Sequence, residues 1–428
     1  MTLRVHPDDI VRTSSSALVG AHDSWERVRL SDVADVLNGF AFKSSLFARD
    51  KGVPLIRIRD VGRDRTDTGY TGDFDPMYLV EPGELVIGMD GDFRAARWRG
   101  PTAVLNQRVC KVNVRDPELY DPQLLLYALP GYLDAVHAHT SSVTVKHLSS
   151  RTVQELPLPL PPLNEQRRIV AAIEEHLSRL DSADASLAAV TRRFGALRLE
   201  ILESAFAVDS PAVEIGSIAK VGSGATPKRG RAEYWEGGTI PWVTSGQLNN
   251  SYVREPAEYI TEQAVSETNV KLWPSGTLLV ALYGEGRTRG RCAELAIHAT
   301  TNQACAAVAL NEAAADRVFV RRFFDATYAA NRRLSAGGVQ PNLSLALIRR
   351  LKVPLPPLEE QRRIVAEVEA RLSALDALRA SIERAERRSK ALRAAILARA
   401  FAGELVPQDP ADEPASVLLD RIRAGRTV

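Results

Sequence analysis

The sequence predicts an α+β protein built from two globular domains, each followed by one long helix. The first observation is a repeat, because Pro159–Ala207 and Pro354–Ala402 agree at about 29 of 49 positions. The second is that both copies lack proline after their first five residues and are rich in the helix formers Ala, Leu, Glu and Arg. The third is that the segments before them alternate short apolar runs with Gly- and Pro-rich turns, as α+β domains do. A repeat of this length indicates a pseudo-two-fold chain: domain, helix, domain, helix.

The bulk composition is that of an ordinary globular chain. It has 428 residues, of which 45% are hydrophobic and 25% charged, enough for two to four domains. Three cysteines without a CxxC pair argue against a disulfide framework and a zinc ribbon. We find no apolar signal segment and no run long enough to cross a membrane, so we expect a cytoplasmic protein. The net charge of +2 is weak support for nucleic-acid binding.

The two globular segments share sequence landmarks although they are otherwise unlike. In each, an apolar strand-like run leads into a loop rich in Gly and Arg, and an Asn-Gln pair follows before the next apolar run. We favour a structural role for the Asn-Gln pair, and the alternative is an adenine reader. The matching stretches are Gly83–Met89 and Gly276–Leu282, Asp90–Gly100 and Tyr283–Arg291, and Leu105–Val112 and Thr301–Val308.

Each repeat opens with proline, which holds the chain extended and prevents helix before it. A PxxP ligand is the alternative to a structural role, but the same helix start follows both copies. Asn164 is a predicted N-cap for the first helix, and Glu359 is a poorer cap in the second. Asp184 and Arg379 fall on the apolar seam at equivalent positions, where their opposite charges could help set the register; the alternative is a neighbouring solvated pair.

The apolar residues of both helices recur at a spacing of three and four, which is typical of a coiled coil. A lone helix of this length must bury its seam, and the obvious partner is the other copy. Because the ends of a domain usually lie close together, the second helix should run back along the first, antiparallel to it. The seam residues are Val170, Ile173, Leu177, Leu180, Leu187, Phe194 and Ile201, and Val365, Val368, Leu372, Leu375, Ile382 and Ile396.

Several of these stretches resemble the specificity subunit of type I restriction–modification systems. The two copies of PLPPL(N/E)EQRRIV look like its central and distal conserved regions, and Val221–Leu248 and Gly39–Phe47 look like the openings of its two target-recognition domains. Ala400–Ala424 is similar to its C-terminal tail. The likeness covers nearly the whole chain from about Trp25, and the departures from it are small.

The resemblance implies a division of the chain. It gives an N-terminal extension that could be disordered, two α/β target-recognition domains, two conserved helices and a tail. Each domain would read one half of a bipartite DNA site, and the helices would set the spacing and dock two modification subunits, which restriction subunits join. The boundaries are 1–24, 25–158 (first domain), 159–208 (central helix), 209–353 (second domain), 354–402 (distal helix) and 403–428.

No motif for chemistry is found in the sequence. It lacks a D/N-P-P-Y/F tetrapeptide, a GxxxxGK[ST] phosphate loop, HExxH and Cys/His clusters at zinc spacing. We therefore expect a chain that is not an enzyme and has no cofactor of its own. The resemblance implies that S-adenosylmethionine, ATP and Mg²⁺ belong to partner subunits.

The candidate contact residues follow from charge and position. Arginine suits bidentate contact with phosphate and guanine, and the Arg-rich loops occupy equivalent places in both domains. The candidates for DNA binding are Arg94, Arg97 and Arg99, and Lys228, Arg229, Arg231, Arg287, Arg289 and Arg291. The candidates for partner binding are Glu165, Gln166, Arg167 and Arg168, and Glu360, Gln361, Arg362 and Arg363.

Two other functions remain open from the sequence. The near-neutral charge permits a scaffold with two ligand-binding domains on a coiled-coil strut and no role with DNA. An autonomous nuclease is the weakest alternative, because pairs such as Asp90 and Asp92, or Asp64 and Asp67, lack the rest of a nuclease motif.

Overall fold

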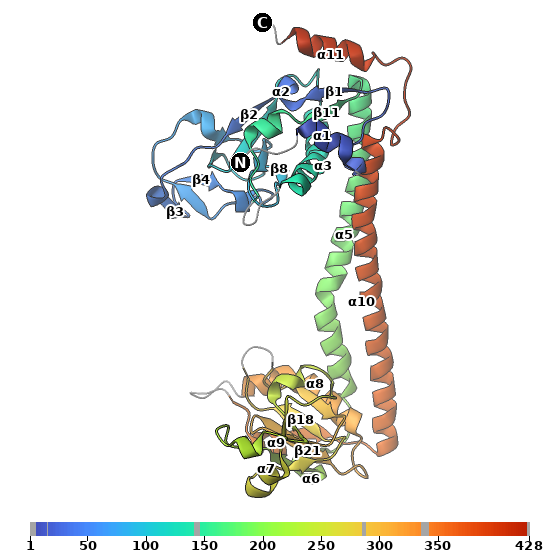
Figure 1. Cartoon of the computed structure of the whole chain (residues 1–428). Coiled ribbons are helices and arrows are strands. Elements are labelled where there is room, and N and C mark those ends of the chain that lie inside the picture. The colour runs from blue at the N-terminus through green and yellow to red at the C-terminus, as the bar shows by residue number, and fades with distance from the viewer. Residues whose placement is uncertain (1–5, 15, 141–145, 285–287, 335–341, 426–428) are drawn as a thin grey trace. The chain divides into compact units, whose positions relative to one another are not determined.

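The computed structural model describes residues 6–14, 16–140, 146–284, 288–334 and 342–425. The chain divides into two compact units, one of residues 1–186 and 385–428 and one of residues 187–384. Each unit holds one globular domain and half of each long helix, so the two units are described separately (Figure 1). The predicted fold class, two α/β domains with two long antiparallel helices, is confirmed.

Besides the two-stranded β1–β11 pair, the first domain contains two larger sheets. One is antiparallel, in the order β2-β10-β7-β8, and the other is mixed, in the order β3-β5-β4-β9-β6, with β4 and β9 parallel. The strands are β1 Glu26–Arg29, β2 Ala34–Asn38, β3 Phe47–Arg49, β4 Val53–Ile56, β5 Thr68–Tyr70, β6 Leu79–Val80, β7 Leu85–Gly88, β8 Ala95–Arg97, β9 Ala103–Leu105, β10 Val109–Val114 and β11 Pro157–Leu160. The α-helices are α1 Pro7–Thr13, α2 Leu30–Val33, α3 Pro122–His139 and α4 Ser150–Gln154.

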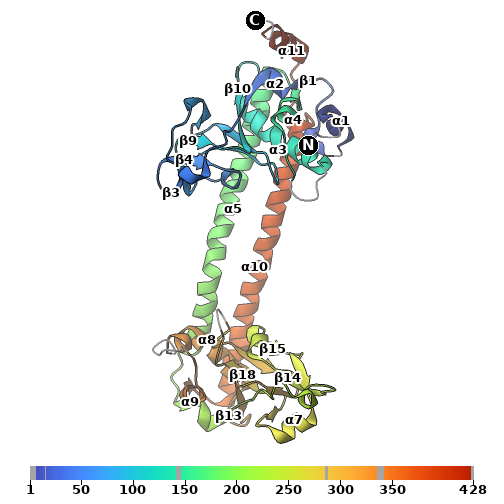
Figure 2. The ribbon, with the colours of Figure 1, turned by 60° about the vertical axis from the view of Figure 1, so that its left-hand side comes forward.

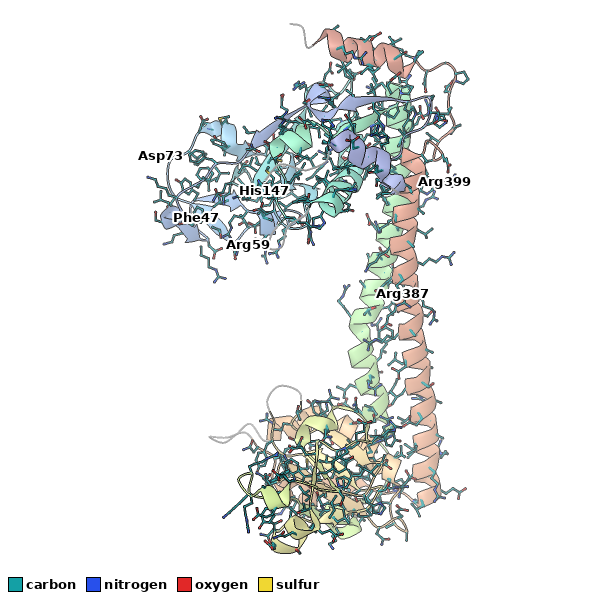
Figure 3. All side chains as sticks on the ribbon, viewed as in Figure 1. Phe47, Arg59, Asp73, His147, Arg387 and Arg399 are labelled. Carbon is teal, nitrogen blue, oxygen red and sulfur yellow. The ribbon has the colours of Figure 1, made fainter. Side chains whose placement is uncertain are left out.

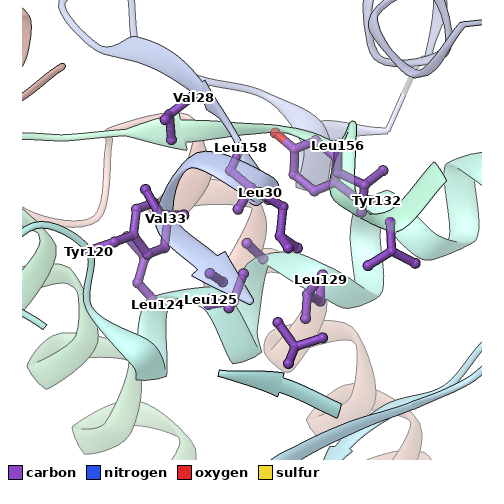
Figure 4. Packing of buried hydrophobic residues seen from close by; sticks show 14 of the residues in the cluster. Val28, Leu30, Val33, Tyr120, Leu124, Leu125, Leu129, Tyr132, Leu156 and Leu158 are labelled. Atoms are coloured by element: carbon purple, nitrogen blue, oxygen red, sulfur yellow. The ribbon is translucent and has the colours of Figure 1, made fainter. Parts of the chain in front are cut away.

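The main core of this unit joins α3 to the β1–β11 pair and to the start of the first long helix. Leu124 and Leu129 of α3, Leu158 of β11 and Leu30 of α2 are fully buried together (Figure 4). Ile173 of the long helix belongs to the same cluster. The long helix is therefore anchored in the domain by its own apolar residues.

The second domain repeats the central strands of this topology and has the matching two-stranded pair β12–β22, but β15 is added to one larger sheet and β3 has no counterpart in the other. Its larger sheets are β13-β21-β18-β19-β15 and β16-β14-β20-β17, and β14 and β20 are parallel as β4 and β9 are. The strands are β12 Ala212–Glu214, β13 Ala219–Ser223, β14 Ile240–Val243, β15 Tyr252–Val253, β16 Glu258–Ile260, β17 Leu272–Trp273, β18 Leu278–Ala281, β19 Cys292–Leu295, β20 Ala299–Thr301, β21 Cys305–Leu310 and β22 Lys352–Pro354. The α-helices are α6 Ile215–Ile218, α7 Glu262–Glu267, α8 Arg317–Leu334 and α9 Leu345–Arg350.

The shared landmarks of the sequence are shared elements of structure. The apolar runs form β7 and β18, and Gly83 and Gly276 before them both have positive φ, 97° and 88°, which glycine adopts without strain. Ser149 and Ser344 cap α4 and α9 with their side chains.

The proline-rich approach to the first long helix is a strand, β11, paired with β1. The Leu30 N–H bonds to the Leu156 carbonyl, so in this antiparallel ladder every second pair, including Val28–Leu158, is hydrogen-bonded. Pro157 and Pro159 fall on the positions between, where no N–H is required. The alternation of Leu and Pro thus fits a strand.

The long helices are α5, Leu163–Ala205, and α10, Leu358–Phe401. In the first unit, the first half of α5 packs on the last half of α10, with Asp184 accepting hydrogen bonds from Ser389 (3.1 Å) and Arg393 (2.9 Å) (Figure 2). In the second unit, Arg198 of α5 lies 3.9 Å from Asp376 of α10. The pairing is antiparallel, as predicted.

Two local predictions about the helices are wrong. Asn164 is not an N-cap, because α5 begins at Leu163 and the Gln166 N–H already bonds to the Pro162 carbonyl. Arg379 is not on the seam, because its side chain is 66% exposed and pairs with Glu383 of the same helix. Only Asp184 of the predicted charged pair reaches the other helix.

Both ends of the chain pack on the first domain. Residues 1–24 were expected to form an extension that could be disordered, but Pro7–Thr13 is helix α1 and Ile10 is fully buried in the main core. At the other end, α11, Ala415–Ala424, buries Leu418 and Ile422 in that core. No helix within the described residues is long and apolar enough to span a membrane.

Candidate nucleic-acid interface and partner surface

The Arg-rich loop of the first domain lies around β8, and its three arginines differ in their surroundings. Arg97 is held in place, because its guanidinium donates to the Gln123 side chain (2.7 Å) and to the Gly83 carbonyl (2.8 Å). It braces β8 against the start of α3. Arg94 is 72% exposed and only 3.6 Å from the equally exposed Asp92, and Arg99 is exposed. Arg94 and Arg99 are therefore available for a ligand, whereas Arg97 is not.

A cavity of about 360 Å³ opens beside Arg94 in the first domain. It is lined by the segment after β4, including Arg59 and Arg63, and by the loop after β7, including Asp90. Figure 3 labels Arg59 in this domain. Sequence reasoning missed Arg59 and Arg63, although the run RIRDVGRDR, with alternating arginines directly after a strand, was a signal for them.

Carboxylates orient the arginines of that segment. The buried Asp60 accepts the Arg57 backbone N–H at 3.0 Å. Asp67 lies 2.8 Å from the Arg59 guanidinium, and hydrogen bonds from Thr68 and Arg59 hold the pKa of Asp67 below its usual value. Asp67 is therefore charged at neutral pH and holds Arg59.

In the second domain, most of the predicted cations are already paired. Arg229 stacks 3.9 Å over the Trp235 ring and forms two hydrogen bonds with Glu258. Arg231 bonds to Glu233 and to the Tyr234 hydroxyl. These two side chains tie together the segment before β14.

The other four candidates of the second domain differ from one another in exposure and in contacts. Lys228 is exposed, and only its carbonyl is engaged, by the Trp235 indole N–H. Arg291 lies 5.2 Å over the Tyr328 ring, and the half-buried Arg289 also has an interaction within the chain. Arg287 lies outside the described residues.

The second domain also has a hollow after the short helix that corresponds to the one beside the first domain's cavity. After β4 and β14 the chain forms the short 3₁₀ helices η3, Ile58–Asp60, and η6, Ser245–Asn249, each with a capping box. A cavity of about 540 Å³ follows η6, lined by Gln247, Asn250, Tyr252 and Arg254 among others. Amides, a phenol and an arginine are the donors and acceptors that suit base edges and phosphates.

The first turns of α5 and α10 hold the predicted partner-binding residues, but two of those residues point inward. Gln166 is fully buried, with Oε1 accepting the Asp121 N–H (2.8 Å) and Nε2 donating to the Pro161 carbonyl (2.9 Å). Gln361 makes the same pair of bonds with Asp316 (2.8 Å) and Pro356 (2.7 Å). Each glutamine fixes its helix to the segment before α3 or α8, so it cannot touch a partner.

The first turn of α5 is covered by the chain's own tail. Arg168 makes two hydrogen bonds with Asp412, whose side chain is 6% exposed. Glu165, 1% exposed, accepts hydrogen bonds from Gln408 and from the Trp25 indole. Burial raises the pKa of Glu165, while these hydrogen bonds oppose the rise.

The first turn of α10 lacks such a cover among the described residues. Glu360 and Arg363 pair with each other, and the Arg363 side chain is 64% exposed. Arg362 is exposed, and Arg167, 50% exposed, pairs with Glu118. The exposed members of the predicted set are thus Arg167, Glu360, Arg362 and Arg363.

The described residues hold no group of three or more His, Cys, Asp or Glu side chains that could bind a metal ion. The three cysteines are buried and free, and burial raises the pKa of Cys110 and of Cys305 to about 12. These thiols stay protonated and unreactive at neutral pH. The surface chemistry is that of recognition by arginines, amides and aromatic rings.

Comparisons with known proteins agree on one family. The family model of the type I restriction modification DNA specificity domain matches residues 22–192 and again residues 208–390. The EcoBI specificity subunit of a type I restriction enzyme from Escherichia coli is 32% identical, over 98% of this chain and 96% of its own.

Two solved structures share the fold. A chain from a study of complex assembly and conformational transition of the type I R-M system has a TM-score of 0.66 at 20% identity, covering 90% of this chain and 99% of its own. The HsdS subunit from Thermoanaerobacter tengcongensis has a TM-score of 0.59 at 19% identity, covering 90% and 98%.

Proposed function

This chain belongs to the type I restriction modification DNA specificity family, and on that premise we propose that each of its domains reads one half of a bipartite DNA site. The chain supplies recognition, and partner subunits supply the chemistry. It acts as the non-catalytic specificity subunit of its complex.

One observation carries the proposal. The two domains share the order of their central strands, parallel β4–β9 and β14–β20 pairs and the same first-turn glutamine, yet their exposed loops carry different side chains. A common frame with unlike surfaces is what two readers of unlike half-sites require. A scaffold for two identical ligands would keep the surfaces alike.

The polar groups of the domain surfaces have two proposed roles. Arg94, Arg99 and Lys228 are exposed without a strong ion pair, which suits phosphate contacts that give affinity without sequence information. The cavities beside η3 and η6 hold the polar groups that suit base edges. Arg97, Arg229 and Arg231 bond to other residues of their own domains and hold neighbouring segments in place.

Two modification subunits dock on the helices, and restriction subunits join them. The exposed Glu360, Arg362 and Arg363 offer one charged docking surface at the start of α10. At the start of α5 the tail covers Glu165 and Arg168, and the exposed Gln408 lies on its outer surface, so that docking site includes the tail.

The DNA contacts are tested by binding of a duplex bearing the site, with the modification subunit present, across a salt series. Arg94→Ala and Arg99→Ala should weaken binding to every sequence and lower the salt slope by about 0.9 for each phosphate that is no longer neutralised. The matched control is Arg179→Ala, a helix arginine 72% exposed and paired with Glu175. An unchanged slope in both variants would remove these residues from the interface.

The docking surface is tested by titration of the labelled modification subunit. Arg362→Glu with Arg363→Glu should weaken its binding at one of two sites, because reversed charge opposes a fitted partner. The control is Arg12→Glu in α1, 78% exposed. Two undisturbed sites in the double variant would contradict the assignment.

A further inference from the structure

The turn between β9 and β10, residues 106–108, and the turn between β20 and β21, residues 302–304, sit in matching backbone frames. In the first domain, the Met89 N–H bonds to the Arg108 carbonyl (2.8 Å) and the Leu148 N–H to the Met89 carbonyl (2.7 Å). In the second, Leu282 bonds in the same way to Ala304 (2.8 Å), and Leu343 to Leu282 (3.1 Å).

A third bond of the frame also repeats. The Phe40 N–H bonds to the Leu105 carbonyl (3.0 Å), and the Ala225 N–H bonds to the Thr301 carbonyl (2.9 Å). The positions next to these bonds can therefore be compared one by one, although the two domains have diverged in sequence. We call the four positions at or next to these bonds, which the next paragraph names, the edge set.

The edge set carries entirely different side chains in the two domains. In the first domain these positions hold Asp90, Arg108, His147 and Phe40, whose exposed ring packs on Phe42 and Tyr78. The second domain has Tyr283, Ala304, Asn342 and Ala225 at those places. The frame is kept and the surface it presents is exchanged, which is expected where each domain selects its own target.

Arg108 lies against two other members of its set. His147 Nδ1 donates to Asp90 at 2.5 Å, and the Arg108 guanidinium lies beside the His147 ring with Nη1 3.1 Å from Nδ1 and Nε 3.7 Å from Asp90 (Figure 3 labels His147). Its side chain is 51% exposed. A guanidinium that is partly oriented before binding loses less conformational entropy on contact with a target.

The backbone of Arg108 is a second, independent sign. Its φ is 70°, a left-handed conformation that a residue with a side chain adopts at a cost of about 1 kcal/mol, and Ala304 does not share it. Strain of this kind persists where the surrounding structure imposes it, and it concentrates at recognition sites.

Charge decides between phosphate and base as the target. Asp90 is 3.7 Å from Arg108 and only 23% exposed, so it offsets part of the arginine's charge, and more than the 78% exposed Asp92 does for Arg94; this makes Arg108 the weaker phosphate ligand of the two. A neutral base edge has no such conflict, and arginine is the usual partner of the guanine O6 and N7 acceptors. Asp90 also lines the cavity that contains Arg59, Arg63 and Arg94, so the set adjoins the cavity proposed above for base recognition.

We propose that Arg108, positioned by Asp90 and His147, reads a guanine in the half-site of the first domain, and that Tyr283 and Asn342 read a base at the matching place in the other half-site. This inference rests on the proposed function and assigns base recognition to a particular surface of each domain. None of these residues was a candidate for DNA binding from the sequence.

The test uses the full chain with its modification subunit and a library of duplexes randomised at every position. Selection by binding and sequencing gives the preference at each base. Arg108→Gly, which suits the positive φ, and Arg108→Lys, which keeps the charge but loses the planar fork, should each reduce the preference for guanine at one position by about ten- to a hundredfold. The rest of the motif should remain.

Matched variants locate the effect. Asp90→Asn should weaken the preference at the same position while binding of unrelated DNA is kept, which a purely structural role would not produce. Tyr283→Ala should alter one position of the other half-site, and Arg99→Ala should alter none. Urea unfolding confirms that each variant folds.

The outcomes separate the inference from the proposed function. If the wild-type complex selects a bipartite motif but both Arg108 variants select the same motif, Arg108 does not read a base and the inference is overturned. If the wild-type complex itself selects no motif, the proposed function fails.

Discussion

Gln166 and Gln361 occupy the same place in the two helices and make the same hydrogen bonds, so a single residue type anchors both halves of the repeat. Sequence alone presents them as part of a charged EQRR run and therefore as surface. Their burial depends on the Asp121 and Asp316 N–H groups, 45 residues away, which no local pattern contains.

Gln361→Ala should lower the free energy of unfolding by about 2–3 kcal/mol, because it leaves the buried Asp316 N–H and Pro356 carbonyl without partners. The control is its exposed neighbour Arg362→Ala, which should change stability by less than about 0.5 kcal/mol. Urea unfolding measures both. Equal, small effects would show that the glutamine is not the anchor.

The Arg168–Asp412 pair gives the tail a dependence on pH. The hydrogen bond from Arg168 holds the pKa of Asp412 below its usual value. Because the folded pKa is depressed, the pair stabilises the docked tail above the ordinary carboxyl pKa of about 4 and loses this effect as pH falls through the folded value.

Asp412→Asn should therefore speed amide hydrogen exchange in α11 at pH 7, because it should lower the free energy of opening by about 1–2 kcal/mol. The difference from wild type should shrink on acidification below about pH 4. Asp420→Asn, at a side chain 78% exposed, serves as the control. Hydrogen exchange measured by mass spectrometry gives this difference at each pH. A difference between variant and wild type that stays unchanged in acid would contradict the pH dependence of the tail.

At the scale of elements, the helices and the proline strands are the parts that sequence predicts well. Helix propensity and the three-four spacing are local, and alternating Leu and Pro on β11 matches the alternation of its ladder with β1. The first residue of α5 and the pairing of Arg379 were mispredicted, because both depend on neighbours across the fold.

If helix length sets the spacing of the half-sites, removing one turn from each helix should shorten the gap between them. Deleting Ala188–Thr191 from α5 and Arg384–Arg387 from α10 takes out about 6 Å, or one or two base pairs at about 3.4 Å each. The half-sites themselves should stay the same. Methylation mapping reads both quantities.

The control replaces the same residues by alanine, which keeps the helix length and should keep the gap. Altered half-sites together with an unchanged gap in the deletion variant would contradict this role of the helices.

At the scale of the whole molecule, the repeat predicted the order of domains, the antiparallel helices and the shared strands, because these are kept in both copies. It could not predict which cations are free. Arg97 is engaged by Gln123, 26 residues away, and Arg229 by Glu258, 29 residues away, whereas Arg94 and Arg99 are not. Nor could it predict the tail over α5, which joins Arg168 to a residue 244 positions later.

The same reason explains why the edge set was missed. Asp90, Arg108 and His147 lie on three separate segments, and only the folded frame brings them together. A repeat comparison finds what two domains share, whereas recognition resides in what they do not share.

The central claim, that two unlike domains of one chain read two unlike half-sites, is tested most directly by long-read methylation mapping of the host with and without this chain. The account predicts one bipartite motif with two different halves, present with the chain and absent without it. Methylation that is the same in both, or a motif with two identical halves, would contradict it.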